Sequence, residues 1–228
     1  MLKFHLKLKN LISAIDTTLF PSFCLNCKKD TPENPPSLRW LCVECHRLLE
    51  PKWQNASHKP EIEESFYIFD YEKDKLAQKV IRTLKYGWIK DLAETLYVYM
   101  EKERLNIKNL EFDLIVPMPL HKYRLKERGF NQSKLIADKI AEITQKEIHE
   151  DIIKRKIHKK PQAEIKKRDE RAKNITGIFK VIDADKISGK TILIVDDVAT
   201  TGATLKECAR VLKDSGASKI LSFTLAQD

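Results

Sequence analysis

The stretch ILIVDDVATTGAT, residues 192–204, decides the fold of this chain. Its first four residues are apolar and mostly β-branched, as in a strand that is buried on both faces of a parallel sheet. Two carboxylates, Asp196 and Asp197, follow where that strand should emerge, and then comes a short turn of hydroxyl residues with one glycine. From Leu205 the pattern LKECARVL becomes helical. The stretch therefore predicts a strand, a tight turn and the N-terminus of a helix.

The predicted turn has the composition of a phosphate site. Backbone N–H groups at a helix N-terminus bind phosphate, helped by the positive end of the helix dipole. Thr200, Thr201 and Thr204 can add hydroxyl donors, and Gly202 permits close approach of the backbone. The two acids would repel a phosphate but suit vicinal hydroxyls, which donate to carboxylates. A phosphate beside a diol describes ribose 5-phosphate, and the alternative is a strand that ends in solvated acids before an ordinary helix.

Four cysteines with the spacing C-x2-C-x14-C-x2-C form the second strong motif: Cys24, Cys27, Cys42 and Cys45. This is close to the spacing of four-thiolate zinc sites, and disulfide pairing is the competing interpretation. Lys or His interrupts every apolar run in MLKFHLKLK, so we expect no signal peptide and reduced thiols. We therefore expect a structural Zn²⁺ site, with His46 as a surface neighbour. The fifth cysteine, Cys208, is expected in the core.

The charge of the chain is unevenly distributed. The chain has 228 residues and a formal net charge of +9, enough length for one substantial domain and a small module. Residues 154–173 hold ten Lys and Arg against three Asp and Glu. No run of 18 apolar residues occurs, so no transmembrane segment is expected. We expect a cytoplasmic protein, and a place at the inner face of the membrane stays open.

Strands and helices are predicted to alternate along most of the chain. The segments ESFYIFDYE, DLIVPMPL and SKILSFTLA are typical of strands, and KLAQKVIRTLKY, DLAETLYVYMEKERL and SKLIADKIAEITQK are typical of helices. This alternation predicts an α/β fold with a parallel sheet and helices on both faces. We place the N-terminal segment and the zinc module in residues 1–58 and the larger domain in residues 59–228, with a linker over 51–61.

A basic loop is expected after DLIVPMPL. The sequence HKYRLKERGFNQS brings together Lys122, Arg124, Lys126 and Arg128. In open parallel sheets ligands bind beyond the carboxyl ends of the strands, and Arg can hold phosphate oxygens in a bidentate manner. The loop therefore predicts a diphosphate contact, with a solvated basic loop as the alternative.

Taken in order, these motifs resemble the ComF/ComFC family. The resemblance rests on the four-Cys module, K-Y-G at 85–87, V-P-x-P-L with RxxxRGFNQ, PQ…R…N, and the signature for 5-phosphoribosyl 1-diphosphate (PRPP) at 192–204. It runs from about Cys24 to the last residue. It implies a type I phosphoribosyltransferase-like parallel sheet flanked by helices, with a small N-terminal four-Cys zinc module. The resemblance also implies a link to natural transformation and DNA uptake.

The resemblance implies a role for each matching residue. Asp196 and Asp197 would hold the ribose hydroxyls, while Arg124 and Arg128 would contact or screen the diphosphate; the two acids and Arg128 would form the catalytic set. Lys85 would be a further phosphate contact, with a surface lysine as the alternative. The 5-phosphate would be bound by Ala199, Thr200, Thr201, Gly202, Ala203 and Thr204. A mobile loop covering the site would carry Lys159, Lys160, Gln162 and Arg168. Mg²⁺ would be held mostly by oxygens of PRPP itself and by waters.

We therefore expect a PRPP-binding, phosphoribosyltransferase-like protein of natural competence that handles incoming single-stranded DNA, with an acceptor that the residues do not specify. The alternative is a non-catalytic module that binds single-stranded DNA and uses PRPP only as a ligand, because residues 154–173 could track a nucleic-acid backbone. A third class is a scaffold without chemistry. The expected partners are PRPP and single-stranded DNA, and other DNA-uptake proteins stay open.

Overall fold

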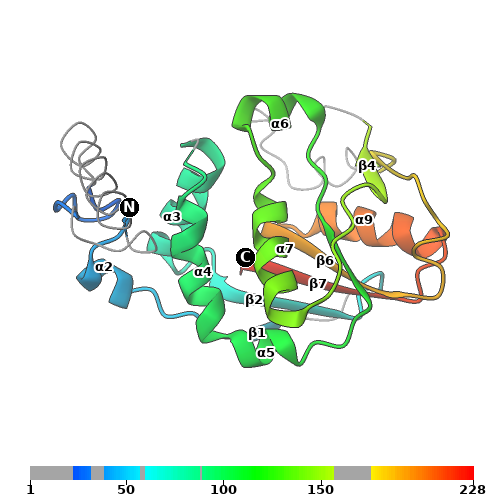
Figure 1. Cartoon of the computed structure of the whole chain (residues 1–228), viewed down its shortest axis with the longest axis horizontal. Coiled ribbons are helices and arrows are strands. Elements are labelled where there is room, and N and C mark those ends of the chain that lie inside the picture. The colour runs from blue at the N-terminus through cyan, green and yellow to red at the C-terminus, as the bar shows by residue number, and fades with distance from the viewer. Residues whose placement is uncertain (1–22, 32–38, 57–59, 88, 157–175) are drawn as a thin grey trace, which may run out of the picture.

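A five-stranded sheet forms the centre of the computed structural model, which describes residues 23–31, 39–56, 60–87, 89–156 and 176–228 (Figure 1). The strand order is β1-β2-β7-β6-β3. The strands are β1 (Gln54–Ala56), β2 (Glu64–Asp70), β3 (Leu114–Pro117), β6 (Thr191–Ala199) and β7 (Lys219–Gln227). The last four are parallel, and β1 joins one edge in the antiparallel direction. The predicted parallel sheet is confirmed, with one antiparallel edge strand added.

Helices cover both faces of this sheet, as predicted. They are α2 (Val43–Arg47), α3 (Lys75–Tyr86), α4 (Leu92–Lys102), α5 (Arg104–Lys108), α6 (Lys122–Arg128), α7 (Gln132–Thr144) and α9 (Ala203–Asp214). One buried apolar cluster joins the sheet to α3, α4 and α7, and a second joins it to α9 and to the small sheet of β4 (Ile153–Arg155) and β5 (Phe179–Val181). Figure 1 shows α7 in front of the sheet and α9 behind it. Among the described residues, none of the helices has both the length and the apolar character to cross a bilayer.

The apolar run of β6 explains this layering. Residues 192–195 are all fully buried. Leu193 and Val195 belong to the cluster on the α7 face, whereas Ile192 and Ile194 belong to the cluster on the α9 face. Successive side chains of a strand point to opposite faces, so a strand covered on both sides has no polar position until it emerges.

The basic segment after β3 is a helix rather than the predicted loop. Nδ1 of His121 accepts the Tyr123 N–H at 3.3 Å and so caps the first turn of α6. Gly129, at φ 78°, ends the helix and donates its N–H to the Leu125 carbonyl at 2.8 Å. The helix lacks the apolar period by which sequence reasoning finds helices, so only these two end residues could have indicated it.

Two further boundaries differ from expectation. The segment predicted as one helix from residue 91 is divided into α4 and α5 at Glu103, whose N–H bonds to the Met100 carbonyl three residues back. The predicted linker contains β1, and Trp53 just before it stacks on Phe66 of β2 at 5.1 Å between ring centroids. The domain boundary at residue 58 stays a prediction.

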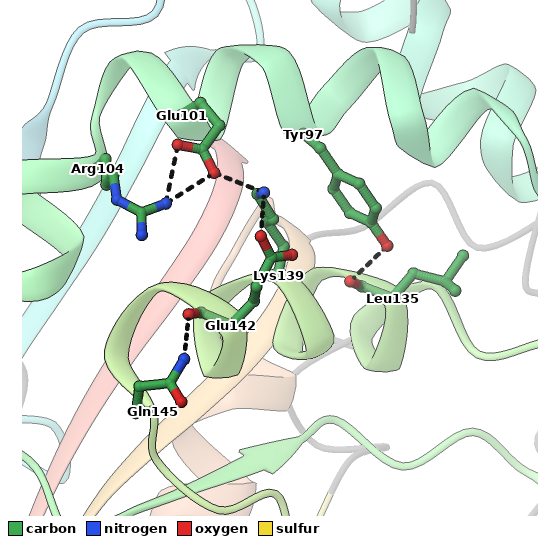
Figure 2. Close-up of polar contacts among 7 residues, drawn as sticks. All are labelled: Tyr97, Glu101, Arg104, Leu135, Lys139, Glu142 and Gln145. Carbon is green, nitrogen blue, oxygen red and sulfur yellow. Dashed lines mark hydrogen bonds and ion pairs between the residues drawn. The ribbon is translucent and has the colours of Figure 1, made fainter. Parts of the chain in front are cut away.

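Polar contacts tie α4 and α5 to α7 (Figure 2). The Tyr97 hydroxyl donates to the Leu135 carbonyl at 2.9 Å. The residue Lys139 is only 9% exposed, and its Nζ lies 2.5 Å from Glu101 and 3.0 Å from Glu142. Glu101 also accepts two hydrogen bonds from Arg104 of α5. These contacts fix α7 against α4, and the first turn of α7 reaches the carboxyl edge of the sheet.

Candidate functional site

The carboxyl ends of the parallel strands share one edge of the sheet. Pro117 at the end of β3 pairs with Val195 of β6, and the Met118 N–H donates to the Val195 carbonyl at 2.8 Å. The sheet therefore brings the start of α7, which follows β3, beside the tip of β6. Ligands of open parallel sheets bind at this edge.

Two acids at the end of β6 form the centre of the site. Oδ1 of Asp196 accepts the Ser133 hydroxyl at 2.8 Å and the Asp197 N–H at 2.9 Å. Oδ1 of Asp197 lies 2.9 Å from Nζ of Lys85, at the C-terminal end of α3. The side chains of Asp197 and Lys85 are only 8% and 20% exposed, respectively, so this ion pair is largely shielded from solvent. One ammonium group thus faces two carboxylates.

The surroundings of Asp196 bring the pKa of its carboxyl close to neutral pH. Burial raises the pKa of Asp196 to about 7, and the charge of Asp197 adds to this, while Lys85 and the hydrogen bonds from Ser133 and Asp197 oppose it. Burial by itself would lower the pKa of Lys85, but the charges of Asp197 and Asp196 outweigh that effect and raise it above its usual range. The lysine therefore stays charged, and the acid pair is close to accepting a proton at neutral pH.

The turn after the acids lies at the N-terminus of α9. Gly202 adopts φ 67°, a conformation that favours glycine, and as the N-cap residue it has no side chain to cap the helix. Thr200 and Thr201 are exposed, and the Thr201 hydroxyl accepts the Ala203 N–H at 3.4 Å. The first N–H groups of a helix have no partner within the helix. The turn therefore presents hydroxyls beside backbone donors, and its role as a phosphate site stays a prediction. Cys208, further along α9, is fully buried, which confirms it as a core residue.

The arginine motif lies against the same edge. Arg128 is 7% exposed, and its guanidinium donates to Gln132 Oε1 at 2.9 Å. The guanidinium also stacks over the ring of Tyr86, with its carbon 5.2 Å from the centroid. Nε2 of Gln132 is buried and has no acceptor among the described residues. Gln132 and Tyr86 contact the Arg128 guanidinium, and Arg124 is the more exposed of the two arginines.

Sequence reasoning missed Ser133 and Arg155. Burial lowers the pKa of Arg155 of β4, the charge of Arg124 lowers it further, and Asp196 opposes both. Arg155 therefore lies within electrostatic reach of Arg124 and Asp196, and its buried Nε has no acceptor among the described residues. Both residues had a signal in the sequence, because Arg155 belongs to the basic stretch and Ser133 directly follows RGFNQ.

A basic groove of about 720 Å³ runs beside the exit of β3. Its cationic residues are Lys90, Lys122, Lys134, Lys154, Arg155 and Lys156, and its apolar residues include Phe130 and Leu135. A larger cavity of about 900 Å³ lies at the amino ends of the strands, beside Asp113, Thr191 and Lys219. That cavity is at the wrong end of the sheet to belong to the acids.

Most of the predicted site falls at one edge. The structure places Lys85, Arg128 and the two acids in a connected cluster, and the turn 199–204 follows directly on the acids. The four residues assigned to a mobile loop, Lys159, Lys160, Gln162 and Arg168, lie outside the described residues.

The four predicted metal ligands lie together. Their sulfur atoms are all within 4.8 Å of one another, and none forms a disulfide. Sγ of Cys27 and Sγ of Cys42 are 3.6 Å apart. A tetrahedral zinc site with Zn–S bonds of about 2.3 Å places its sulfurs about 3.8 Å apart. The four cysteines therefore fit a metal ion such as zinc.

The surroundings of the cysteine cluster tie it to the main core. Cys45 accepts a side-chain hydrogen bond from Asn26 at 3.4 Å. His46 is not the surface residue that we predicted, because its Nδ1 lies 2.6 Å from the hydroxyl of Tyr99, which is fully buried in α4. Burial lowers the pKa of His46, so the neutral ring is favoured. Cys24, Cys42 and Cys45 belong to the same buried cluster as Tyr99.

Comparison with known proteins finds a phosphoribosyl transferase domain and relatives named for competence and DNA utilization. A family model described as a phosphoribosyl transferase domain matches residues 133–228. The chain is 28% identical over 217 residues to competence protein F of Haemophilus influenzae, covering 90% of each chain. It is 32% identical over 212 residues to the DNA utilization protein YhgH of Salmonella typhi, covering 90% of this chain and 84% of that protein. Competence protein ComFC of Bacillus subtilis is 38% identical over 113 residues, which are 49% of this chain and 43% of that protein.

Among solved structures, an adenine phosphoribosyltransferase from Leishmania donovani aligns with 77% of this chain and 87% of its own. The TM-score is 0.40 and the identity 11%. The strand order and the match to a phosphoribosyl transferase domain define the fold as phosphoribosyltransferase-like.

We expect Asp196→Asn to stabilise the unliganded protein, and more so at high pH. The raised pKa means that the folded state binds the proton more tightly than the unfolded chain does, so the wild type loses stability between about pH 4 and about pH 7. The variant has no such loss, and its advantage should reach on the order of 2 kcal/mol above pH 7 after allowance for partial exposure of the site. Urea unfolding at pH 5 and pH 8 measures this, with the exposed Asp185→Asn as a control that should show no such trend. An advantage that does not grow with pH would contradict the electrostatic account.

Proposed function

This chain belongs to the ComF/ComFC family, and on that premise we propose that it is a phosphoribosyltransferase-like protein that binds PRPP at the carboxyl edge of its sheet. One observation carries the proposal: a carboxylate pair, a threonine-rich turn at a helix N-terminus and a cluster of arginines meet at that edge. PRPP consists of a diol, a phosphate ester and a diphosphate. Each of these three parts has a matching set of groups in the site.

Each set of residues has one task in this proposal. Asp196 and Asp197 accept hydrogen bonds from the ribose hydroxyls, and residues 199–204 bind the 5-phosphate. Arg124 and Arg128 screen the diphosphate, and Arg155 adds a third positive charge. When the C1–O bond breaks, the electron pair leaves with the diphosphate, and positive groups held in place beforehand stabilise that charge. The acceptor forms the new bond to C1 and gives up a proton to solvent. Mg²⁺ would enter the site with the ligand, bound mostly by oxygens of PRPP itself and by waters.

Titration calorimetry with Mg-PRPP tests the ligand, and a diphosphate-release assay with candidate acceptors tests turnover. We expect the wild type to bind and the double variant Asp196→Asn, Asp197→Asn to bind at least roughly 10-fold more weakly, because each hydrogen bond to a charged group contributes about 1.5–3 kcal/mol. Asp185→Asn makes the same chemical change at an exposed position and should bind like the wild type. Wild-type protein that shows no heat with Mg-PRPP, and no rise in melting temperature in its presence, would refute the proposal.

We further propose a role with single-stranded DNA, for which the basic groove is the specific support. The relatives are named for competence and for DNA utilization. The groove carries six cationic residues against Asp138 and Glu150, with Phe130 beside them. Lysines and arginines along a groove neutralise phosphates, and aromatic rings stack on exposed bases. This role is compatible with PRPP binding, since neither Asp196 nor Asp197 lines the groove.

The salt dependence of binding to an oligothymidine tests this role. We expect the triple variant Lys122→Ala, Lys154→Ala, Lys156→Ala to bind more weakly and to reduce the slope of log affinity against log salt by about 0.7 for each phosphate that the protein no longer neutralises. The control is Lys108→Ala, Lys146→Ala, Lys219→Ala, which removes the same charge from the cavity at the amino ends. If both triple variants lose the same affinity, the groove is not the nucleic-acid site.

The cysteine cluster supports a structural zinc ion, which we also propose. Cys24, Cys27, Cys42 and Cys45 would fill a tetrahedral shell and leave no position for chemistry. Residues 39–49 contribute few buried side chains of their own, among them Leu41 and Leu49, so a bound ion would hold the module on the core.

Elemental analysis of the purified chain should find one zinc ion per molecule. Cys45→Ser should lose most of that zinc, and its melting temperature should fall by several degrees, because about 1 kcal/mol corresponds to a few degrees in a chain of this size. Cys208→Ala removes a buried thiol elsewhere and should keep the zinc, even if packing loss lowers its melting temperature. Full zinc content in Cys45→Ser would contradict the assigned ligand set.

A further inference from the structure

The K-Y-G turn that ends α3 touches both halves of the site. Nζ of Lys85 lies 2.9 Å from Asp197, and the ring of Tyr86 lies under the guanidinium of Arg128 at 5.2 Å. Gly87 closes the helix by donating its N–H to the Thr83 carbonyl at 2.7 Å. A Cβ on Gly87 would also come within 2.7 Å of that carbonyl oxygen, closer than a side chain tolerates. The turn therefore connects the acids to Arg128 through Lys85 and Tyr86, and its last position requires a glycine.

Lys85 is a charge partner of the acids in the unliganded protein. Its ammonium group meets Asp197 in a poorly solvated place, and the charge of Asp196 also acts on it. Interactions between unit charges there are several times stronger than in bulk water. Other elements supply the polar and titratable groups around Lys85, Asp196 and Asp197. These groups are Ser133 of α7, Arg155 of β4, Cys208 of α9, and Tyr71 after β2.

We propose that Lys85 is a positioning residue that fixes Asp197 and supplies the positive charge that keeps the acid pair ready to accept the hydroxyls of a ribose. This inference rests on the proposed function, because it assigns a role within the same site. It also makes the site responsive to pH. Hydroxyls donate to the ionised carboxylates, so affinity for a ribose should rise as Asp196 loses its proton through about pH 7. Without Lys85, that rise should move to higher pH, because a nearby opposite charge favours the ionised acid.

A phosphate contact and a charge partner predict different ligand dependences. If Lys85 held a phosphate, its removal would weaken the binding of inorganic diphosphate. If it positions the acids, its removal weakens the binding of ribose 5-phosphate. The affinity for inorganic diphosphate then stays within about twofold of the wild type, because diphosphate has no hydroxyls that donate hydrogen bonds to the acids. The two probes therefore separate the two roles on the same variant.

The experiment compares Lys85→Met with the wild type, with Lys85→Arg as the conservative variant and Lys79→Met as the matched control. Lys79 is an exposed lysine on the same helix. Titration of the Asp196 carboxyl by ¹³C NMR needs no ligand. We expect its midpoint near 7 in the wild type and in Lys79→Met, at least about one pH unit higher in Lys85→Met, and restored in Lys85→Arg. Calorimetry with ribose 5-phosphate and with inorganic diphosphate between pH 6 and pH 9 gives the second readout.

The outcomes separate the inference from the proposed function. An unchanged Asp196 midpoint in Lys85→Met overturns the inference, even if the chain binds PRPP. So does a loss of diphosphate affinity equal to the loss of ribose 5-phosphate affinity. A shifted midpoint in a chain that binds no phosphoribosyl ligand overturns the proposed function and supports the charge coupling of Lys85. If Lys85→Met does not fold, Lys85→Gln provides a second neutral variant for the same measurements.

Discussion

Two adjacent carboxylates at the tip of a buried strand are the constraint on which the site depends. At an effective dielectric constant of 20, two like charges 4 Å apart cost about 4 kcal/mol. Lys85 offsets a cost of this size with an opposite charge 2.9 Å from Asp197, and two hydrogen bonds to Asp196 reduce it further. Burial first, and the charge of Asp197 after it, still raise the pKa of Asp196 to about 7, so the compensation is incomplete. Ligand hydroxyls that donate to the acids would complete it, so the same imbalance that destabilises the free protein favours a diol.

The position of the acids depends on helices at some distance from them. Ser133 reaches Asp196 from the first turn of α7, and α7 is held against α4 by the hydrogen bond from Tyr97 to Leu135. Two residues further along α4, Tyr99 contacts His46, the neighbour of a predicted zinc ligand. A contiguous set of contacts thus runs from the cysteine cluster through α4 and α7 to the acids. These contacts give the cysteine module a structural role in the main domain that a tethered appendage would not have.

The sequence predicted those parts of the fold that have a short, dense signature. The run from Ile192 to Val195 correctly predicted a strand buried on both faces, and the four cysteines lie together as their spacing indicated. Helix α6 was missed because its seven residues are bounded by a cap and a glycine and have no apolar stripe. The partner of Lys85 was also missed, because the ion pair joins residues more than one hundred positions apart. Side-chain pairs of this kind depend on strand order, which the local pattern of a single sequence does not contain.

The opposite needs of the acids and the arginines explain why the site is spread over several elements. Hydroxyls need anionic acceptors, whereas phosphates need cations, and groups of both signs on one element would neutralise each other. In this chain the acids lie at the tip of β6, and the cations come from α3, α6 and β4. Burial first, and the charge of Arg124 after it, lower the pKa of Arg155, so these two cations repel each other as the two acids do. A ligand with hydroxyls at one end and a diphosphate at the other relieves both repulsions at once. A ligand with only one of these ends relieves only one of the two repulsions, so the charge pattern favours molecules that carry both.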